Sequence, residues 1–475
     1  MARLSGPEIK WVKPEVPKTA AMTRKAVTAK KAGGAARAAK KVQPDPLIRM
    51  IQELGEPMPP VPMSPRDEAV FFLQVAAEVE HAFIVEYLYA AYSLDESPGD
   101  PVADWQGRIL QIAKEEMGHL ITVQNLLLLL GSAIYLNREE YPRHKDLYPF
   151  PLLLEPLSKA SLDKYITAES PFDANKPVSQ IHHVGVIYAK IYWLFQKSDQ
   201  PQGPYKLPKD IPFTHGHHVR DSDLLPANQN TLQTKPEEWF ASGDIHVDPT
   251  TARDKALNAI SVIARQGEGL QPEDNSHYER FVQIRKEIDE YLQAGHSAFA
   301  RDIATNPTTS TRPGVPKGSQ ITNPQTTLWL RLFNCRYQML LLDIALAMSF
   351  TSSEQLDGEP ARTKLAQEWA VFGEMTGALS NLARLLMKLP KDNTPGGPGI
   401  PRFAGPQFRL PVDPFPVDAL GRWLRYRHLL ETTASLISQV TPADAEQTGI
   451  LESLKNTDQD RLTFVQKRID SINEV

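Results

Sequence analysis

Apolar residues recur at helical spacing through most of this chain, from about residue 65 to its C-terminal part. The most regular run predicts one long helix with a single buried face. Its apolar positions are Ile109, Ile112, Ala113, Leu120, Val123, Leu126, Leu127 and Leu130. Similar runs predict further helices over about 65–93, 178–195, 251–266, 326–350, 364–389, 417–440 and 444–473, and another that opens at residues 275–277.

The segments between these runs are rich in proline and have little regular pattern. They cover residues 137–177, 197–250, 304–325 and 390–416. Proline and glycine interrupt helices and strands, so we expect long irregular connections here. The sequence shows no strand alternation of any length, and the predicted fold class is all-α.

Composition excludes several classes of protein. The chain has 475 residues, a formal net charge of −5 and a single cysteine. This charge argues against a nucleic-acid-binding protein, and one cysteine excludes a disulfide framework. No apolar run reaches the length of a membrane span. Residues 1–17 lack the apolar centre of a secretory signal, so we expect a cytoplasmic protein that does not contact a membrane.

The N-terminal 46 residues differ in composition from the rest of the chain. Residues 20–42 are rich in alanine, lysine and arginine and contain no acidic residue. This composition predicts a basic, disordered tail over residues 1–46. A docking arm for an acidic partner is the alternative interpretation. The sequence leaves the oligomeric state open.

Glu116 and His119 lie three positions apart on the buried face of the most regular helix. Their carboxylate and imidazole groups therefore point the same way. An inward-facing Glu-x-x-His pair is the pattern by which four-helix bundles hold two iron or manganese ions. A structural pair in the core is the alternative, because buried polar pairs often have no other role.

Glu80 lies on the apolar stripe of the helix predicted over 65–93. The stripe also contains Leu73, Ala76, Ala77, Phe83, Ile84 and Tyr87. A buried carboxylate needs a partner or a metal ion. Glu78 and His81 form a second Glu-x-x-His pair in this helix, but their face is less apolar. We therefore place Glu80 at the site and expect a supporting or structural role for His81.

Two further candidates lie near residue 270. His277 shares a helix face with Phe281, Ile284 and Ile288, so it points inward. Glu268 lies between Gly267 and Gly269, where the backbone is expected to leave helical geometry. Such interruptions are tolerated at functional sites.

A histidine cluster lies in the long polar connection at 197–250. It consists of His215, His217 and His218. A group of histidines in a loop without a structured carboxylate is more often a surface feature than a metal site. We therefore expect that it is not the principal metal site.

Four runs together resemble the ferritin-like domain family of iminophenyl-pyruvate dimer synthase, a domain that also forms part of the violacein-pathway synthase. The runs are Glu78-Val79-Glu80-His81, Glu115-Glu116-Met117-Gly118-His119, Gln266-Gly267-Glu268-Gly269 and Ser276-His277-Tyr278-Glu279-Arg280-Phe281. A later run, Ala404-Gly405-Pro406 followed by Phe408, fits the same family, so the resemblance covers roughly residues 65–412. It implies a ferritin-like four-helix bundle with long loop insertions over 47–320, and additional C-terminal helices over 321–475 packed on the bundle.

The resemblance also implies the residues that face the metal. They are Glu80, Glu116, His119, Glu268 and His277. Ferritin-like proteins carry a tyrosine seven residues after the first glutamate, and Tyr87 has this spacing from Glu80. Tyr87 and Tyr188 are expected to be packing residues, with hydrogen bonds to the site as the alternative. Carboxylates and imidazoles without thiolates suit iron, as one or two ions, with manganese as the alternative.

The third predicted helix departs from the family pattern. Relatives are expected to carry a glutamate there, where this chain has Val186. Valine cannot bind a metal, and His182 and His183, one turn earlier, are candidate substitutes. Because Val186 leaves one wall of the site apolar, we expect at most one fully coordinated metal ion.

The resemblance implies a metal-dependent oxidoreductase that acts on a small organic, amino-acid-derived substrate in secondary metabolism. The alternative is a non-catalytic helical scaffold or interaction protein with a degenerate metal site, of which Val186 would be the trace. Metal storage is disfavoured, because a closed shell of small subunits would not easily accommodate the long insertions.

Overall fold

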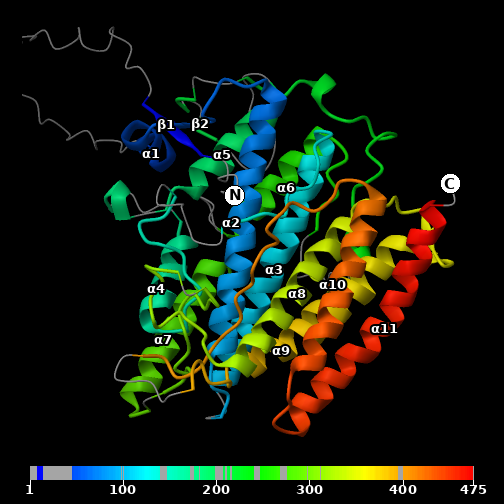
Figure 1. Cartoon of the computed structure of the whole chain (residues 1–475). Coiled ribbons are helices and arrows are strands. Elements are labelled where there is room, and N and C mark those ends of the chain that lie inside the picture. The colour runs from blue at the N-terminus through cyan, green and yellow to red at the C-terminus, as the bar shows by residue number, and fades with distance from the viewer. Residues whose placement is uncertain are drawn as a thin grey trace, which may run out of the picture.

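The computed structural model describes residues 8–13, 45–97, 99, 101–139, 147–171, 176–180, 182–197, 207–208, 211–213, 217–239, 247–267, 275–296, 298–310, 312–393 and 400–473. Helices dominate these residues (Figure 1), and the predicted all-α fold class is confirmed. The strands form two small antiparallel pairs, β1 (Lys10–Val12) with β2 (Glu56–Met58) and β3 (Gln355–Leu356) with β4 (Glu359–Pro360). Short 3-10 turns are η2 (Val178–Gln180), η3 (Asp221–Asp223) and η4 (Pro236–Trp239).

Part of the predicted N-terminal tail is ordered. In β1, Trp11 lies opposite Pro57 of β2, and Lys10 Nζ donates a hydrogen bond to the Pro60 carbonyl at 2.6 Å. The prediction of a disordered tail is therefore wrong for residues 10–12. Residues 14–44, which include the basic segment 20–42, lie outside the described residues.

The first bundle is built on two long helices. After the short α1 (Pro46–Leu54), α2 (Pro65–Ser93) packs along α3 (Val102–Leu129). Ser64 caps α2 by accepting a hydrogen bond from the Asp67 amide at 3.1 Å. Arg66, at the start of α2, donates to the Leu130 carbonyl at 2.7 Å, at the end of α3, so the two helices are antiparallel. Gly131 ends α3 with a φ of +64°, a conformation that glycine adopts without strain.

The third and fourth rods of this bundle each consist of two helices. They are α4 (Lys159–Ala168) with α5 (Val184–Phe195), and α6 (Arg253–Gln266) with α7 (His277–Gln293). Along α5, Tyr188 contacts Glu80, and Lys190 pairs with Glu68 near the start of α2. Helix α5 is therefore antiparallel to α2. Helix α6 begins beside the end of α5 and packs against it.

Helices α4 and α7 form the other half of the bundle. Asp163 of α4 pairs with Arg285 of α7 at 2.8 Å, and Lys159 pairs with Asp289 at 2.6 Å, so these helices are antiparallel. Helix α7 also packs on α3. Helix α5 thus continues the direction of α4, and α7 continues that of α6 (Figure 1). The C-terminal ends of α4 and α6 and the N-terminal ends of α5 and α7 meet midway along α2 and α3.

Helix α4 corrects the prediction that residues 137–177 are irregular. Ser158 and Ser161 form a reciprocal cap at its start, with Ser161 N donating to Ser158 Oγ at 3.0 Å and Ser158 N donating to Ser161 Oγ at 2.8 Å. The helix has only ten residues. So short an apolar pattern gives a weak signal between proline-rich flanks.

The remaining helices form a second four-rod bundle, in agreement with the predicted ranges. Its rods are α8 (Pro324–Ala347), the π-helix η5 (Thr363–Leu379) continued by α9 (Ser380–Leu386), α10 (Ala419–Gln439) and α11 (Ala445–Asn473). Its core contains a buried ionic cluster in which Arg336 Nε donates to Glu374 Oε2 at 2.8 Å. Arg461 also pairs with Glu374, and Asp458 pairs with Arg336.

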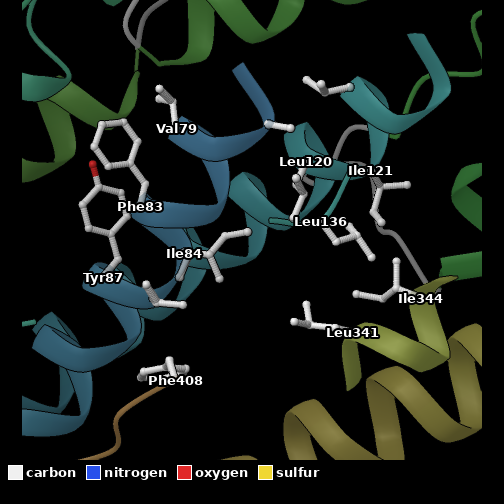
Figure 2. Close-up of a cluster of buried hydrophobic side chains, with 14 of the residues drawn as sticks. Val79, Phe83, Ile84, Tyr87, Leu120, Ile121, Leu136, Leu341, Ile344 and Phe408 are labelled. Carbon is white, nitrogen blue, oxygen red and sulfur yellow. The ribbon is translucent and has the colours of Figure 1, made fainter. Parts of the chain in front are cut away.

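The two bundles share an apolar core (Figure 2). Ile84 of α2 and Ile121 of α3 lie in one cluster with Leu341 of α8, and Phe408 closes one side of it. The Phe408 ring packs at 5.4 Å on Tyr337, whose hydroxyl is hydrogen-bonded to a histidine of α2. The C-terminal helices therefore pack directly on α2 and α3. Within the described residues, none of the helices has the length and apolar character needed to cross a membrane.

Candidate metal centre

Five buried side chains meet where the half-helices end. They form two groups, Glu80–Glu116–His119 and Glu116–Glu169–His277. Within each group, one candidate ligand atom per residue lies within 4.8 Å of the others. All five side chains are at most 1% exposed. Glu116 belongs to both groups, so it occupies the centre of the arrangement.

The distances show how Glu116 is shared. His119 Nδ1 lies 3.0 Å from Glu116 Oε2 and 3.4 Å from Glu80 Oε2. His277 Nδ1 lies 2.6 Å from Glu116 Oε1 and 3.6 Å from Glu169 Oε2. Each carboxylate oxygen of Glu116 therefore faces a different histidine, which is the disposition of a carboxylate that bridges two ions.

Glu169 was missed by the sequence interpretation. It follows the last residue of α4 and is fully buried. Its inward direction could have been inferred from the sequence, because it lies four residues after Tyr165 and on the same apolar face as Leu162. The sequence predicts irregular structure over this stretch, and the family resemblance places the carboxylate at Val186, in the second half of the interrupted rod.

The expectations built on Val186 change accordingly. His182 Nε2 donates to the Ser170 carbonyl at 2.6 Å, and the His183 ring packs on Trp11. Among the described residues, neither histidine belongs to a group that could hold a metal, so their role as substitute ligands is wrong. The missing carboxylate comes from Glu169, which removes the reason for expecting only one fully coordinated ion.

Glu268 lies outside the described residues, but its neighbour Gly267 borders the second group. A Cβ atom on Gly267 would lie 3.3 Å from Glu169 Oε2 and 3.9 Å from His277 Nδ1. A side chain at this position would crowd the space between these two ligand atoms. Glycine therefore keeps that space open.

The other sequence candidates lie away from the cluster. Glu78 accepts a hydrogen bond from Tyr135, and His81 is hydrogen-bonded to Tyr337 of α8. Of the two glutamates, Glu80 belongs to a candidate group and Glu78 does not, and the role of Glu80 as a ligand stays a prediction. His215 lies outside the described residues, and His218 Nδ1 donates to a backbone carbonyl at 2.7 Å. In the part of the chain that the structure describes, no candidate metal group contains His217 or His218.

Four inward-facing atoms make no hydrogen bond of good geometry, although each lies 2.6–3.6 Å from another atom of the cluster. They are Glu80 Oε2, Glu116 Oε1, Glu169 Oε2 and His277 Nδ1. Burying a polar atom without a partner is costly, and each such atom needs an explanation. All four belong to the two groups and face one another, so they have the disposition of metal ligands. The residues present therefore fit a pair of metal ions.

The second oxygen of each terminal glutamate, on the side away from the centre of the cluster, accepts a hydrogen bond. Tyr188 donates to Glu80 Oε1, and Tyr87 donates to Glu169 Oε1. These tyrosines do more than pack, because each fixes one carboxylate and leaves its second oxygen toward the centre. The sequence favours packing roles for both tyrosines, and the hydrogen bonds correspond to the alternative interpretation.

The outer nitrogens of the histidines are hydrogen-bonded too. His119 Nε2 donates to Gln266 Oε1 at 2.8 Å, and His277 Nε2 donates to Glu115 Oε2 at 2.9 Å. A proton on Nε2 leaves the Nδ1 lone pair free to bind a metal. Both imidazoles therefore keep a proton on Nε2 and present Nδ1 to the carboxylates, where a proton or a metal ion can bind.

The electrostatics of the cluster follow from burial and close charges. Burial, aided by the nearby Glu116 carboxylate, raises the pKa of Glu80 to about 8. Burial alone would also raise the pKa of Glu116, but His277 and His119 outweigh it and hold that pKa well below its usual value. Burial likewise opposes charge on His119, yet Glu116 raises its pKa well above the ordinary value. Protons and divalent cations therefore compete for the same atoms.

Comparison with known proteins identifies the class of this bundle. Residues 73–286 match the family described as Ferritin-like, and this segment contains both groups. The resemblance predicted from the sequence is confirmed.

Two curated relatives share this region. Over 420 residues the chain is 27% identical to a dichlorochromopyrrolate synthase of Lentzea aerocolonigenes, covering 78% of this chain and 39% of that protein. Over 399 residues it is 27% identical to a 2-imino-3-(indol-3-yl)propanoate dimerase of Chromobacterium violaceum, covering 77% of this chain and 36% of that protein. The chain thus spans less than two-fifths of the length of these relatives. A solved ferritin-like protein from Caulobacter vibrioides is 18% identical, with a TM-score of 0.38, and the match covers 66% of this chain and 96% of that one.

Proposed function

We propose that this chain is a metal-dependent oxidoreductase of ferritin-like type that binds two iron ions, with manganese as the alternative metal. The observation that carries the proposal is the pair of carboxylate–histidine groups that share Glu116. Four of their inward atoms are buried and make no hydrogen bond of good geometry. A pair of cations would satisfy all of them together, whereas without metal only ion pairs between these carboxylates and protonated histidines are available.

The donor set suits these metals. It contains three carboxylates and two imidazoles and no thiolate, a combination that favours iron or manganese over softer metals. Three carboxylate charges also offset most of the charge of two divalent ions. When bound, such ions supply redox chemistry and positions open to an oxidant or a substrate.

Each residue has a role in holding the ions. Glu80 and His119 would hold one ion, and Glu169 and His277 the other, with Glu116 between them. The tyrosine hydroxyls fix the two terminal carboxylates in the orientation described above. Complete burial keeps bulk water from the cluster, which strengthens the electrostatic interactions there.

The substrate proposal rests on the relatives. One relative is named for dimerising an indolyl imino acid, and the other for synthesising a dichlorochromopyrrolate. We propose that this chain also acts on a small organic molecule derived from an amino acid, in secondary metabolism. The scaffold alternative rested on Val186 as a trace of decay, and Glu169 removes that support.

The test is metal-dependent turnover. The full chain, loaded with ferrous iron without oxygen, is mixed with an aromatic 2-imino acid and then with dioxygen or hydrogen peroxide. We expect substrate consumption, followed by mass spectrometry, that requires iron and is lost in Glu80→Ala. His217→Ala, which changes a histidine outside both groups, serves as the control and should retain activity. Equal consumption with and without iron would contradict the proposal.

A further inference from the structure

We propose that the two metal positions are unequal, and that Glu115 makes the Glu116–Glu169–His277 position the tighter one. The inference rests on the proposed metal binding. It concerns the groups behind the histidines, which act on the metal only through them. Glu115 is in this sense a positioning residue.

The ligands at the two positions are closely matched. Each position has one oxygen of Glu116, one histidine presenting Nδ1, and one terminal glutamate. Each terminal glutamate accepts a hydrogen bond from a tyrosine. All these side chains are buried to the same degree. Within the described residues, the clearest chemical difference is therefore the group that accepts the Nε2 proton of each histidine.

Behind His277 this group is a carboxylate held firmly in place. Glu115 Oε2 lies 2.9 Å from His277 Nε2. Arg280, one turn further along α7, donates to both oxygens of Glu115, with Nη1 3.1 Å from Oε1. Gln111, one turn earlier on α3, donates to Oε1 at 3.0 Å. These donors keep the carboxylate ionised and fix its direction toward the imidazole.

Behind His119 the accepting group is a neutral amide. Gln266 Oε1 lies 2.8 Å from His119 Nε2, and Gln266 is the half-buried last residue of α6. An amide oxygen is a weaker acceptor than a carboxylate oxygen, because it carries less negative charge. The imidazole of His119 is therefore polarised less than that of His277.

A carboxylate behind a ligating histidine raises the basicity of the ligand and holds its ring in place. Removing such a partner typically weakens metal binding by roughly 10- to 100-fold. The position at His277 should therefore fill first as metal is added. The position at His119 should fill second, with an affinity lower by roughly the same factor.

The test is a titration of the full chain with Co²⁺, followed by calorimetry and by the visible absorption of the bound ion. The wild-type protein should take up metal in two steps, separated by roughly 10- to 100-fold in affinity. Glu115→Gln should weaken the first step until the steps converge. Gln266→Glu should strengthen the second, and the double exchange Glu115→Gln with Gln266→Glu should reverse the order of filling. A reversal cannot result from partial unfolding.

The chain offers a matched control. Glu287 of α7 pairs with Arg108 of α3, with Arg108 Nη1 3.2 Å from Glu287 Oε1. This pair joins the same two helices as Glu115 and Arg280, but it contacts no histidine of the cluster. Glu287→Gln should therefore leave both steps unchanged. Two equal steps in the wild type, or steps that Glu115→Gln does not move, would overturn the inference while leaving the proposed metal binding intact. A wild-type protein that takes up no metal would instead overturn the proposed function.

Discussion

Replacement of Glu116 by alanine is expected to remove both metal ions, whereas Glu80→Ala or Glu169→Ala should remove only one. The reason is geometric: the two oxygens of Glu116 face different histidines, and each terminal glutamate belongs to a single group. Without Glu116, each position would keep one carboxylate and one imidazole. The measurement is the iron content per chain after anaerobic loading and desalting.

Glu78→Ala is the matched control for this series. Glu78 lies in the same helix as Glu80 and is equally buried, but it accepts a hydrogen bond from Tyr135 away from the cluster. The variant should therefore keep both ions. If Glu116→Ala retained an ion as firmly as Glu80→Ala does, Glu116 would not be shared between two positions.

The largest expected effect on stability lies in the second bundle. Glu374→Gln should lower the free energy of unfolding by about 3–5 kcal/mol, because it removes one partner of a buried ionic cluster. Glu374 is fully buried and pairs with both Arg336 and Arg461. Asp343, buried nearby, cannot compensate, because burial raises its pKa well above its usual value and favours its neutral form. The variant should keep the metal content of the wild type.

The stability prediction is checked by denaturant unfolding against a surface control. Lys388 and Glu446 form an exposed pair at 3.9 Å. Exposed pairs contribute about 0–1 kcal/mol, so Glu446→Gln should change stability little. If Glu374→Gln destabilised the protein no more than Glu446→Gln does, the buried cluster would not stabilise the C-terminal bundle as we infer.

The sequence predicted the long helices and most of the cluster for the same reason. Glu80, Glu116, His119 and His277 lie on strongly apolar faces, so their periodicity shows that they point inward. That four inward polar residues from three separate helices should meet follows from the cost of burying each one alone. The role of these residues as metal ligands, and of Glu268 beside them, stays a prediction.

What the sequence did not show depends on tertiary structure. Glu169 lies just beyond a short helix, where there is no following turn to reveal its direction. The predicted third helix covered only residues 178–195, with 137–177 expected to be irregular, so a carboxylate at the end of α4 was not considered. Arg336 and Glu374 are likewise separated along the chain, and each alone resembles an ordinary exposed charge in a helix. Only the packing of the rods brings them together.

X-ray diffraction from crystals of the iron-loaded protein, collected at the iron absorption edge, would show directly whether two ions share Glu116. Two anomalous peaks are expected on either side of the Glu116 carboxylate, one beside His119 and the other beside His277. A single peak, no peak between these residues, or iron bound at His217 and His218 instead would contradict this expectation.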